Sequence, residues 1–117
     1  MRARQVVRQL ALDAGLRLID QTKLVTAVSE LARNTVVHGG GGHMSAGLAE
    51  ESGRTGVWAA FEDDGPGIAD VQEAMRQGFT TGDGLGLGLG GAKRLVHEFS
   101  LTTEPGQGVA VRVVTWR

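Results

Sequence analysis

Apolar residues recur every three to four positions over the first 37 residues of the chain, which is the spacing of one face of an α-helix. The spacing predicts a helix over Ala3–Ala14, which Gly15 ends, and a second helix that begins at an N-cap, Asp20, and runs through Val37. The residues predicted to face the core are Val6, Val7, Leu10 and Ala14 on the first helix, and Leu24, Val28, Leu31 and Thr35 on the second.

Much of the remaining chain alternates between apolar and polar positions in short segments, a pattern typical of strands joined by turns. A short helix is predicted at Asp70–Gln77, and another at Ala92–Phe99 after a glycine-rich loop. Because the strands come in adjacent pairs, we expect a two-layer α/β sandwich whose mixed, mostly antiparallel sheet is covered by helices on one face. The predicted strands are Met44–Glu50, Val57–Asp63, Ser100–Thr103 and Val109–Trp116, with turns at Glu51–Gly56 and at "EPGQG" (residues 104–108).

Composition limits the class of protein. The 117 residues suffice for one domain, taken as residues 1–117, and the net charge of −1 gives no reason to expect binding to nucleic acid or to an anionic membrane. The absence of cysteine excludes disulfides and thiolate metal sites, and no apolar signal core is visible, so a soluble cytoplasmic protein is expected. Arg2, Arg4 and Arg8 are interpreted as a solvated helix face rather than a docking patch.

A polar ridge runs along the second predicted helix. Glu30, Asn34 and His38 are spaced by four in "SELARNTVVHG", so each is rotated by about 40° from the one before it. A mid-helix asparagine is a weak helix former, and its amide oxygen is a hard ligand that suits Mg²⁺. The alternative interpretation, a hydrogen-bonded helix edge, explains Glu30 as well as a site does but explains Asn34 less well.

The segment "FEDDGPGI" ends a strand with a carboxylate. Alternation places Asp63 on the same face as Val57 and Phe61, where the helices must cover it and where a carboxylate needs a hydrogen-bond donor. An adenine amino group would be such a donor, and Gly65 and Gly67 would let a flat ring approach the backbone. Taken alone, the segment is equally explained as a plain turn, because Asp-Gly and Pro-Gly are common turn formers.

The segment "TTGDGLGLGLGGAKRL" holds six glycines in sixteen positions. Gly86, Gly88 and Gly91 match G-x-G-x-x-G, but no strand precedes them, so a dinucleotide-binding βαβ unit is rejected, and the P-loop pattern also fails. A glycine loop that leads into a helix and binds an anion remains. Leucines alternate with the glycines, which favours a packed loop over a flexible linker; they are Leu85, Leu87 and Leu89.

The motifs "ELARN…H", "DDGPGI" and "GDGLGLGL", in this order and spacing, resemble the N box and two glycine boxes of the GHKL ATPase superfamily, which includes gyrase, the heat-shock chaperone, histidine kinases and MutL. The short distance from Gly67 to Gly84 resembles the anti-sigma-factor serine kinases. Segments such as "DQTKLVTAVSELARN" and "FTTGDGLGLGLGGAKRLVHEF" are similar to the stressosome-type switch kinases of that group. The resemblance spans nearly the whole chain and implies a Bergerat-type ATP-binding fold.

The resemblance implies that ATP and Mg²⁺ are bound. Asn34 would coordinate the metal, Asp63 would accept a hydrogen bond from the adenine amino group beside Gly67, and Glu30 would be the catalytic general base. His38 is expected to cap the helix or pack beside the adenosine rather than act as a base. The other nucleotide-binding residues implied are Gly65, Ile68, Thr80, Thr81, Gly82, Gly84, Leu85, Gly86, Leu87 and Gly88.

The implied activity is that of a serine/threonine protein kinase that phosphorylates a STAS-domain anti-sigma-factor antagonist and so switches its partners in bacterial signalling. A non-catalytic ATP-binding switch that acts on a sigma factor or a PP2C-type phosphatase stays open, as does a homodimer. A detached histidine-kinase domain is disfavoured, because no helical hairpin with an acceptor histidine is seen. Lys93 and Arg94 are left open between phosphate, partner and plain surface, and His43 and His97 are expected to be surface residues.

The switch kinases that the chain resembles begin with a strand before the first helix, whereas Met1 already falls at that helix. We therefore expect four strands and one open sheet edge, which a partner or upstream residues would cover.

Overall fold

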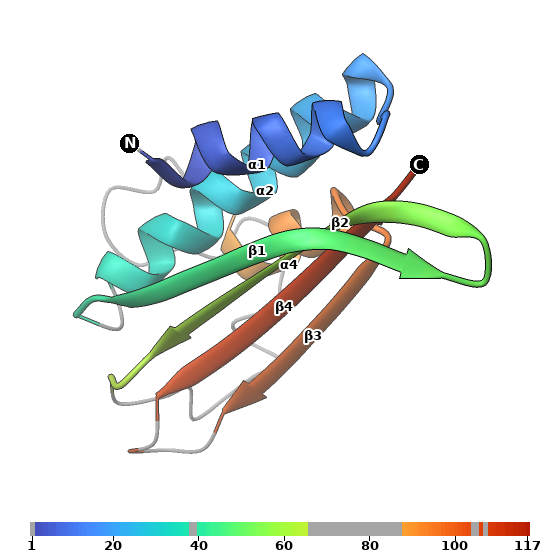
Figure 1. Cartoon of the computed structure of the whole chain (residues 1–117). Helices are drawn as coiled ribbons and strands as arrows, with labels where there is room; N and C mark the ends of the chain where they lie inside the picture. Colours follow the sequence, from blue (N-terminus) through green and yellow to red (C-terminus); the bar gives the residue numbers. More distant parts are fainter. Residues whose placement is uncertain (1, 38–39, 66–87, 104–105, 107) are drawn as a thin grey trace.

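The computed structural model describes residues 2–37, 40–65, 88–103, 106 and 108–117 (Figure 1). Three helices and four strands lie in these ranges. They are α1 (Arg2–Asp13), α2 (Leu18–Val37), β1 (Gly42–Glu51), β2 (Arg54–Asp63), α4 (Gly88–Arg94), β3 (Glu98–Thr103) and β4 (Val109–Trp116). The short helix predicted at residues 70–77 lies outside the described residues.

The described strands form one sheet in the order β1-β2-β4-β3, and every neighbouring pair is antiparallel. The helices lie on one face of this sheet, and α2 contacts both α1 and α4 (Figure 1). The predicted two-layer sandwich with four strands is thus confirmed, although the described sheet is wholly antiparallel rather than mixed. The described sheet has two edge strands, β1 and β3, and the prediction did not say which of them is the open edge. The cover of that edge by a partner or by upstream residues stays a prediction. Within the described residues, no helix is long and apolar enough to cross a bilayer.

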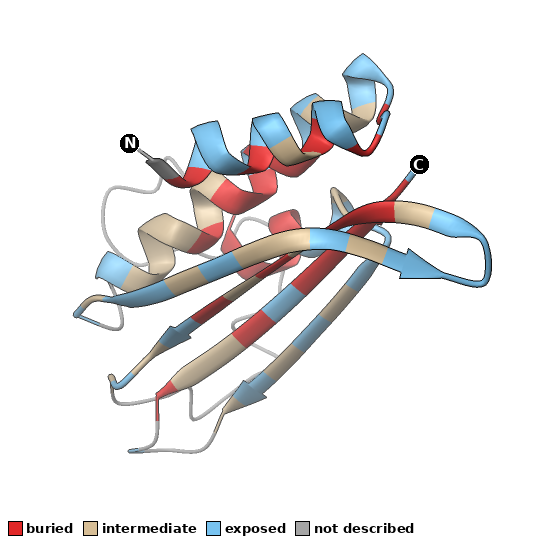
Figure 2. Cartoon of the chain, in the orientation of Figure 1, coloured by how far each residue is buried: buried red, intermediate tan, exposed pale blue. Residues whose placement is uncertain are grey.

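The core lies between α2 and the two central strands (Figure 2). On β2 the alternating residues Val57, Ala59 and Phe61 are buried, as the sequence pattern predicted. The predicted stripe on α2 is confirmed for its three apolar members, whereas Thr35 is half-buried and its hydroxyl donates to the Leu31 carbonyl at 3.0 Å. The buried apolar members on α2 and β4 are Leu24, Val28, Leu31, Val111 and Val113.

The predicted stripe on α1 was partly wrong. Val7 is fully buried, but Val6 is 44% exposed, and the alanines Ala3 and Ala11 face the core in its place. Adjacent residues are rotated by about 100° around a helix, so Val6 and Val7 cannot both face its centre. The small alanine side chains fill the positions one turn before and after Val7.

Gly15 ends α1 as predicted. Its φ of 76° lies in the left-handed region that glycine adopts without strain. The amide of Gly15 donates to the carbonyl of Leu12 at 3.1 Å, and the amide of Leu16 donates to that of Ala11 at 3.0 Å. These two bonds form a Schellman motif, which satisfies carbonyls left open at the helix end.

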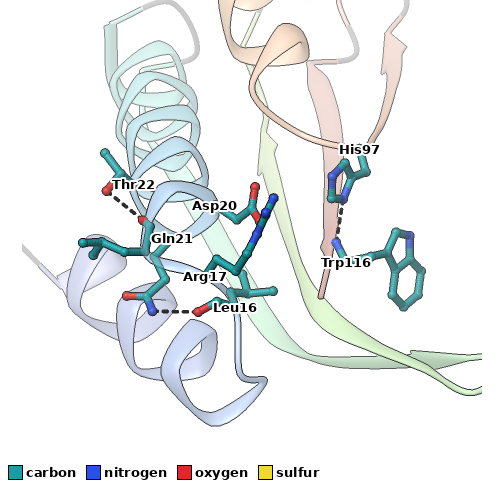
Figure 3. Close-up of polar contacts among 8 residues, drawn as sticks. Leu16, Arg17, Asp20, Gln21, Thr22, His97 and Trp116 are labelled. Carbon is teal, nitrogen blue, oxygen red and sulfur yellow. Dashed lines mark hydrogen bonds and ion pairs between the residues drawn. The ribbon is translucent and has the colours of Figure 1, made fainter.

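The second helix begins at Leu18, so Asp20 lies inside its first turn and is not the predicted N-cap. The Asp20 carboxylate instead pairs with the Arg17 guanidinium, Nε to Oδ2, at 3.2 Å (Figure 3). A carboxylate in the first turn also interacts favourably with the helix dipole. The side-chain amide of Gln21 donates to the Leu16 carbonyl at 2.9 Å and ties the start of α2 to the turn before it (Figure 3).

The helix predicted at Ala92–Phe99 ends earlier, at Arg94. Its continuation was wrong because residues from His97 onward pair with β4: the His97 amide donates to the Val114 carbonyl at 3.0 Å, and Phe99 lies within β3. The His97 imidazole adds a second link, since its Nδ1 accepts a hydrogen bond from the Trp116 amide at 2.8 Å (Figure 3). His97 is exposed, as predicted, and this hydrogen bond gives it a structural contact that the sequence did not reveal.

The first hairpin is longer and its turn tighter than predicted. The strands extend to Glu51 and Arg54, which leaves only Ser52 and Gly53 between them. Both turn residues have positive φ, 52° and 79°, as two-residue hairpins with a primed turn require. In the sequence, the alternation of apolar and polar residues on the second strand begins only at Val57. It therefore could not show that strand pairing already begins at Arg54.

Candidate nucleotide site

The second half of α2, the start of β1 and the end of β2 lie at the same end of the molecule (Figure 1). Glu30 and Asn34, one helical turn apart on α2, are both half-buried, in agreement with the predicted ridge at the border of the core. The Arg33 guanidinium lies 3.8 Å from the Glu30 carboxylate, and the side chains are 32% and 15% exposed. This contact holds a cation beside Glu30 at the surface of α2.

Asp63 is the last residue of β2. Its side chain is half-buried, whereas the sequence pattern predicted a buried one. The strand ends here, so the carboxylate reaches the margin of the core. Its Oδ1 accepts a hydrogen bond from the Gly65 amide at 2.8 Å, which forms a local turn of the kind that aspartate favours. Among the described residues, no hydrogen bond to Oδ2 is present.

Residues from both neighbouring strands surround the Asp63 backbone. Gly42 of β1 and Val109 of β4 lie opposite Asp63 in the sheet register. Gly108, directly before β4, leaves no room for a side chain between itself and the Asp63 carbonyl. The Thr103 hydroxyl donates to the Gly108 carbonyl at 2.8 Å.

Sequence reasoning missed Gly42, Thr103 and Gly108. The two glycines stand in segments, "HGGGGH" and "EPGQG", that read as breaks and turns. Gly42 lies opposite Asp63 in the register, Gly108 comes directly before the Val109 that pairs with Asp63, and Thr103 pairs with Val109. A single sequence does not contain this pairing.

The other predicted site residues divide into two groups. Gly65 lies beside Asp63, and Gly88 is buried at the start of α4, whose glycines and alanine pack closely against α2. Lys93 and Arg94 are exposed at the end of α4, and His43 is exposed on β1. The predictions that lie outside the described residues are His38, Gly67, Ile68, Thr80, Thr81, Gly82, Gly84, Leu85, Gly86 and Leu87.

Comparison with known proteins agrees with this arrangement. Residues 19–117 match the family model described as histidine kinase-, DNA gyrase B-, and HSP90-like ATPase. The chain is 41% identical over 114 residues to the serine/threonine-protein kinase RsbT of Bacillus subtilis, covering 97% of this chain and 86% of the relative. It is 28% identical over 119 residues to an anti-sigma F factor of Thermoanaerobacter, covering 97% and 82%, and 27% identical over 120 residues to that of Bacillus subtilis, covering 95% and 80%.

The family model spans both helical and strand layers, from the first turn of α2 to the end of the chain. It therefore includes Glu30 and Asn34 on α2 and Asp63 on β2. The chain belongs to the histidine kinase-, DNA gyrase B- and HSP90-like ATPase family.

Proposed function

We propose that this protein is an ATP-dependent serine/threonine protein kinase that switches a STAS-domain regulatory protein by phosphorylating it. The observation that carries the proposal is Asp63, a half-buried carboxylate with one oxygen fixed by the Gly65 amide. Asp63 is the last residue of β2, and this strand ends at the same end of the molecule as the second half of α2, the helix that carries Glu30 and Asn34 (Figure 1). The 41% identity to a serine/threonine-protein kinase over 97% of this chain supports the activity.

Asp63 is proposed to read the adenine base. Because Oδ1 is occupied by the Gly65 amide, Oδ2 would accept a hydrogen bond from the adenine amino group. Guanine carries a carbonyl oxygen in place of that amino group, and a carboxylate would repel it. Asp63 would thus select ATP over GTP.

Asn34 is proposed to hold Mg²⁺ through its amide oxygen. The chemistry of Asn34 fits this group, because an amide oxygen is a hard ligand and Mg²⁺ takes few protein ligands when it keeps water and binds phosphates. When bound, the metal would neutralise charge on the phosphates. Asn34, half-buried on the rigid helix α2, would fix its place relative to Glu30.

Glu30 is proposed as the general base. Its carboxylate would take the proton from a serine or threonine hydroxyl of the partner as that oxygen forms a bond to the γ-phosphorus. The bond from the γ-phosphorus to the bridging oxygen breaks, and ADP leaves with the electron pair. Phosphoryl transfer depends mainly on positioning and charge neutralisation, so one base and one metal ligand suffice as catalytic side chains.

The added phosphate would carry nearly two negative charges and three acceptor oxygens, enough to change which protein the substrate binds. The second candidate is a switch that binds ATP and a sigma factor without transferring phosphate. The names of the anti-sigma F factors among the relatives support the sigma-factor partner, but they do not support the lack of transfer. The two candidates share the nucleotide site. They differ in whether Glu30 acts as a general base in phosphate transfer.

The test is transfer of labelled phosphate from ATP to the STAS-domain proteins encoded beside the gene. Glu30→Gln should lower the transfer rate by about 10²–10⁴-fold while ATP affinity stays within about twofold, since the base acts only on the incoming hydroxyl. Glu62→Gln is the matched control, because Glu62 is exposed on the face of β2 that carries no described helix. Transfer by Glu30→Gln at the normal rate would exclude the base assignment, and ATP binding without transfer to any partner would favour the second candidate.

A further inference from the structure

We propose that Gly42 and Gly108 are positioning residues that set the adenine selectivity of the site by fixing the backbone of Asp63. The inference rests on the proposed function and adds to it the elements that hold the selecting carboxylate in place. Neither glycine would touch the nucleotide in this proposal. Because each glycine lacks a side chain, the backbone around Asp63 can pack directly against it, and this close packing holds Asp63 in place.

Gly108 approaches Asp63 from the β4 side. A methyl group at position 108 would lie well inside van der Waals contact with the Asp63 carbonyl oxygen, 2.9 Å from its carbonyl carbon and 3.1 Å from the Asp64 Cα. These are backbone atoms, which cannot rotate away as a side chain can. Gly108 also has a φ of 78°, so the loop before β4 reaches this position in a conformation that glycine permits.

Gly42 approaches the same segment from the β1 side. A methyl group there would collide with the Glu62 carbonyl oxygen and lie 3.0 Å from the Asp63 Cα. The backbone of residues 62–64 is therefore confined between two strands by residues without side chains. A side chain on either glycine would have to push this segment away.

Hydrogen bonds complete the confinement. The Thr103 hydroxyl holds the Gly108 carbonyl at 2.8 Å, and the Gly65 amide holds Oδ1 of Asp63 at 2.8 Å. Hydrogen bonds weaken steeply with misalignment, and a binding group must be held within about 0.5 Å of its productive position. A backbone shift of a few tenths of an ångström at Asp63 would thus weaken the hydrogen bond between its carboxylate and the adenine amino group.

The chain contains a matched control for Gly108. Gly106, two residues earlier, has nearly the same φ, 80°, but a methyl group there would meet no atom of the described residues within 4 Å. Gly106→Ala and Gly108→Ala therefore impose similar backbone strain, and only the second pushes on Asp63.

The experiment measures the dissociation constants of ATP and GTP by calorimetry for the full chain, Gly108→Ala and Gly106→Ala, at a temperature where circular dichroism shows each to be folded. Gly108→Ala should lose about tenfold in ATP affinity and most of the preference for ATP over GTP, whereas Gly106→Ala should keep the preference within about twofold. The ratio is the decisive quantity, because partial unfolding weakens apparent binding of both nucleotides equally.

Equal ATP-to-GTP ratios in Gly108→Ala and Gly106→Ala would overturn the inference while leaving the proposed function intact. An unaltered chain that binds no ATP, or binds both nucleotides alike, would overturn the proposed function itself. If Gly108→Ala does not fold, Thr103→Val decides: it removes the hydroxyl that holds Gly108, and Thr102→Val on the opposite, exposed face is its control. An unchanged ratio in Thr103→Val would also overturn the inference.

Discussion

Two pairs of glycines in the sheet make room for different neighbours. On the face of the sheet that carries no described helix, the ring of Trp58 lies over Gly47 and the ring of Trp116 over Gly56. Ring atoms stand 2.9 Å from where a methyl group would be at either glycine. At the end of β2, Gly42 and Gly108 instead face the backbone around Asp63.

The two tryptophans stabilise the face of the sheet that no described helix covers. Trp116 is only 8% exposed, because its ring packs on Gly56 under the Arg54 guanidinium, 4.2 Å from the ring centroid. Its indole N–H donates to the Glu98 carboxylate at 2.6 Å. Arg112 lies 5.7 Å from the centroid of Trp58 in the same manner. These contacts stabilise the sheet and have no part in the proposed nucleotide site.

The comparison separates two proposed roles for glycine in this protein, one in stability and one in nucleotide selectivity. Substituting Gly56 should cost stability, since a ring and a strand must move, but should leave the site unchanged. Substituting Gly108 should alter the site, since the displaced atoms belong to Asp63. The predictions below test whether stability and selectivity separate in this way.

The largest effect is expected at Asp63. Asp63→Asn keeps an oxygen for the Gly65 amide but removes the charge that accepts the adenine amino group, so ATP affinity should fall by about 2 kcal/mol or more, some 30-fold. Calorimetric titration with ATP measures the affinity, and thermal unfolding should change little. Unchanged affinity would remove Asp63 from the site.

Gly56→Ala should have the opposite profile. The added methyl group would press on the Thr115 carbonyl oxygen and on the Trp116 ring, and overpacking of this kind costs about 2 kcal/mol. The melting temperature should fall by about 10 °C in thermal unfolding, whereas the ATP-to-GTP ratio stays as it was. In Gly47→Ala only the Trp58 ring stands in the way, so the fall should be smaller. A changed ratio of ATP to GTP affinity in Gly56→Ala would contradict the separation of stability from selectivity between the two glycine pairs.

The smallest effect is expected at Thr115, where a substitution should increase stability rather than reduce it. Thr115 is 2% exposed on the helix-covered face, and within the described part of the chain its hydroxyl has no hydrogen-bond partner. Thr115→Val replaces that hydroxyl by a methyl group of similar size and should raise the free energy of unfolding by about 1 kcal/mol in urea denaturation. Thr102→Val, at an exposed position, is the control. A loss of stability in Thr115→Val would show that the hydroxyl has a partner after all.

The sequence predicted the sandwich, the order of the described elements and the inner face of β2, because periodicity reports which side of an element is covered. It also predicted, through motifs held in order along the chain, that Glu30, Asn34 and Asp63 share one site, and this stays a prediction. The structure places the second half of α2 and the end of β2 at the same end of the molecule (Figure 1). It misplaced the end of α4 because "VHEF" suits a helix as well as a strand until β4 is there to pair with it. It missed Gly42 and Gly108, which approach the Asp63 backbone, and Thr103, which bonds to Gly108, because these neighbours follow from how the strands pair, which a single sequence leaves undetermined.

The most direct test of the account is a binding cycle that pairs the Asp63 carboxylate with the adenine amino group. The affinities of ATP and of purine riboside triphosphate, which lacks only that amino group, are measured for the unaltered chain and for Asp63→Asn. The account predicts a preference for ATP of about tenfold or more in the unaltered chain that nearly vanishes in Asp63→Asn, since both changes remove the same hydrogen bond. The same preference in both proteins would contradict it.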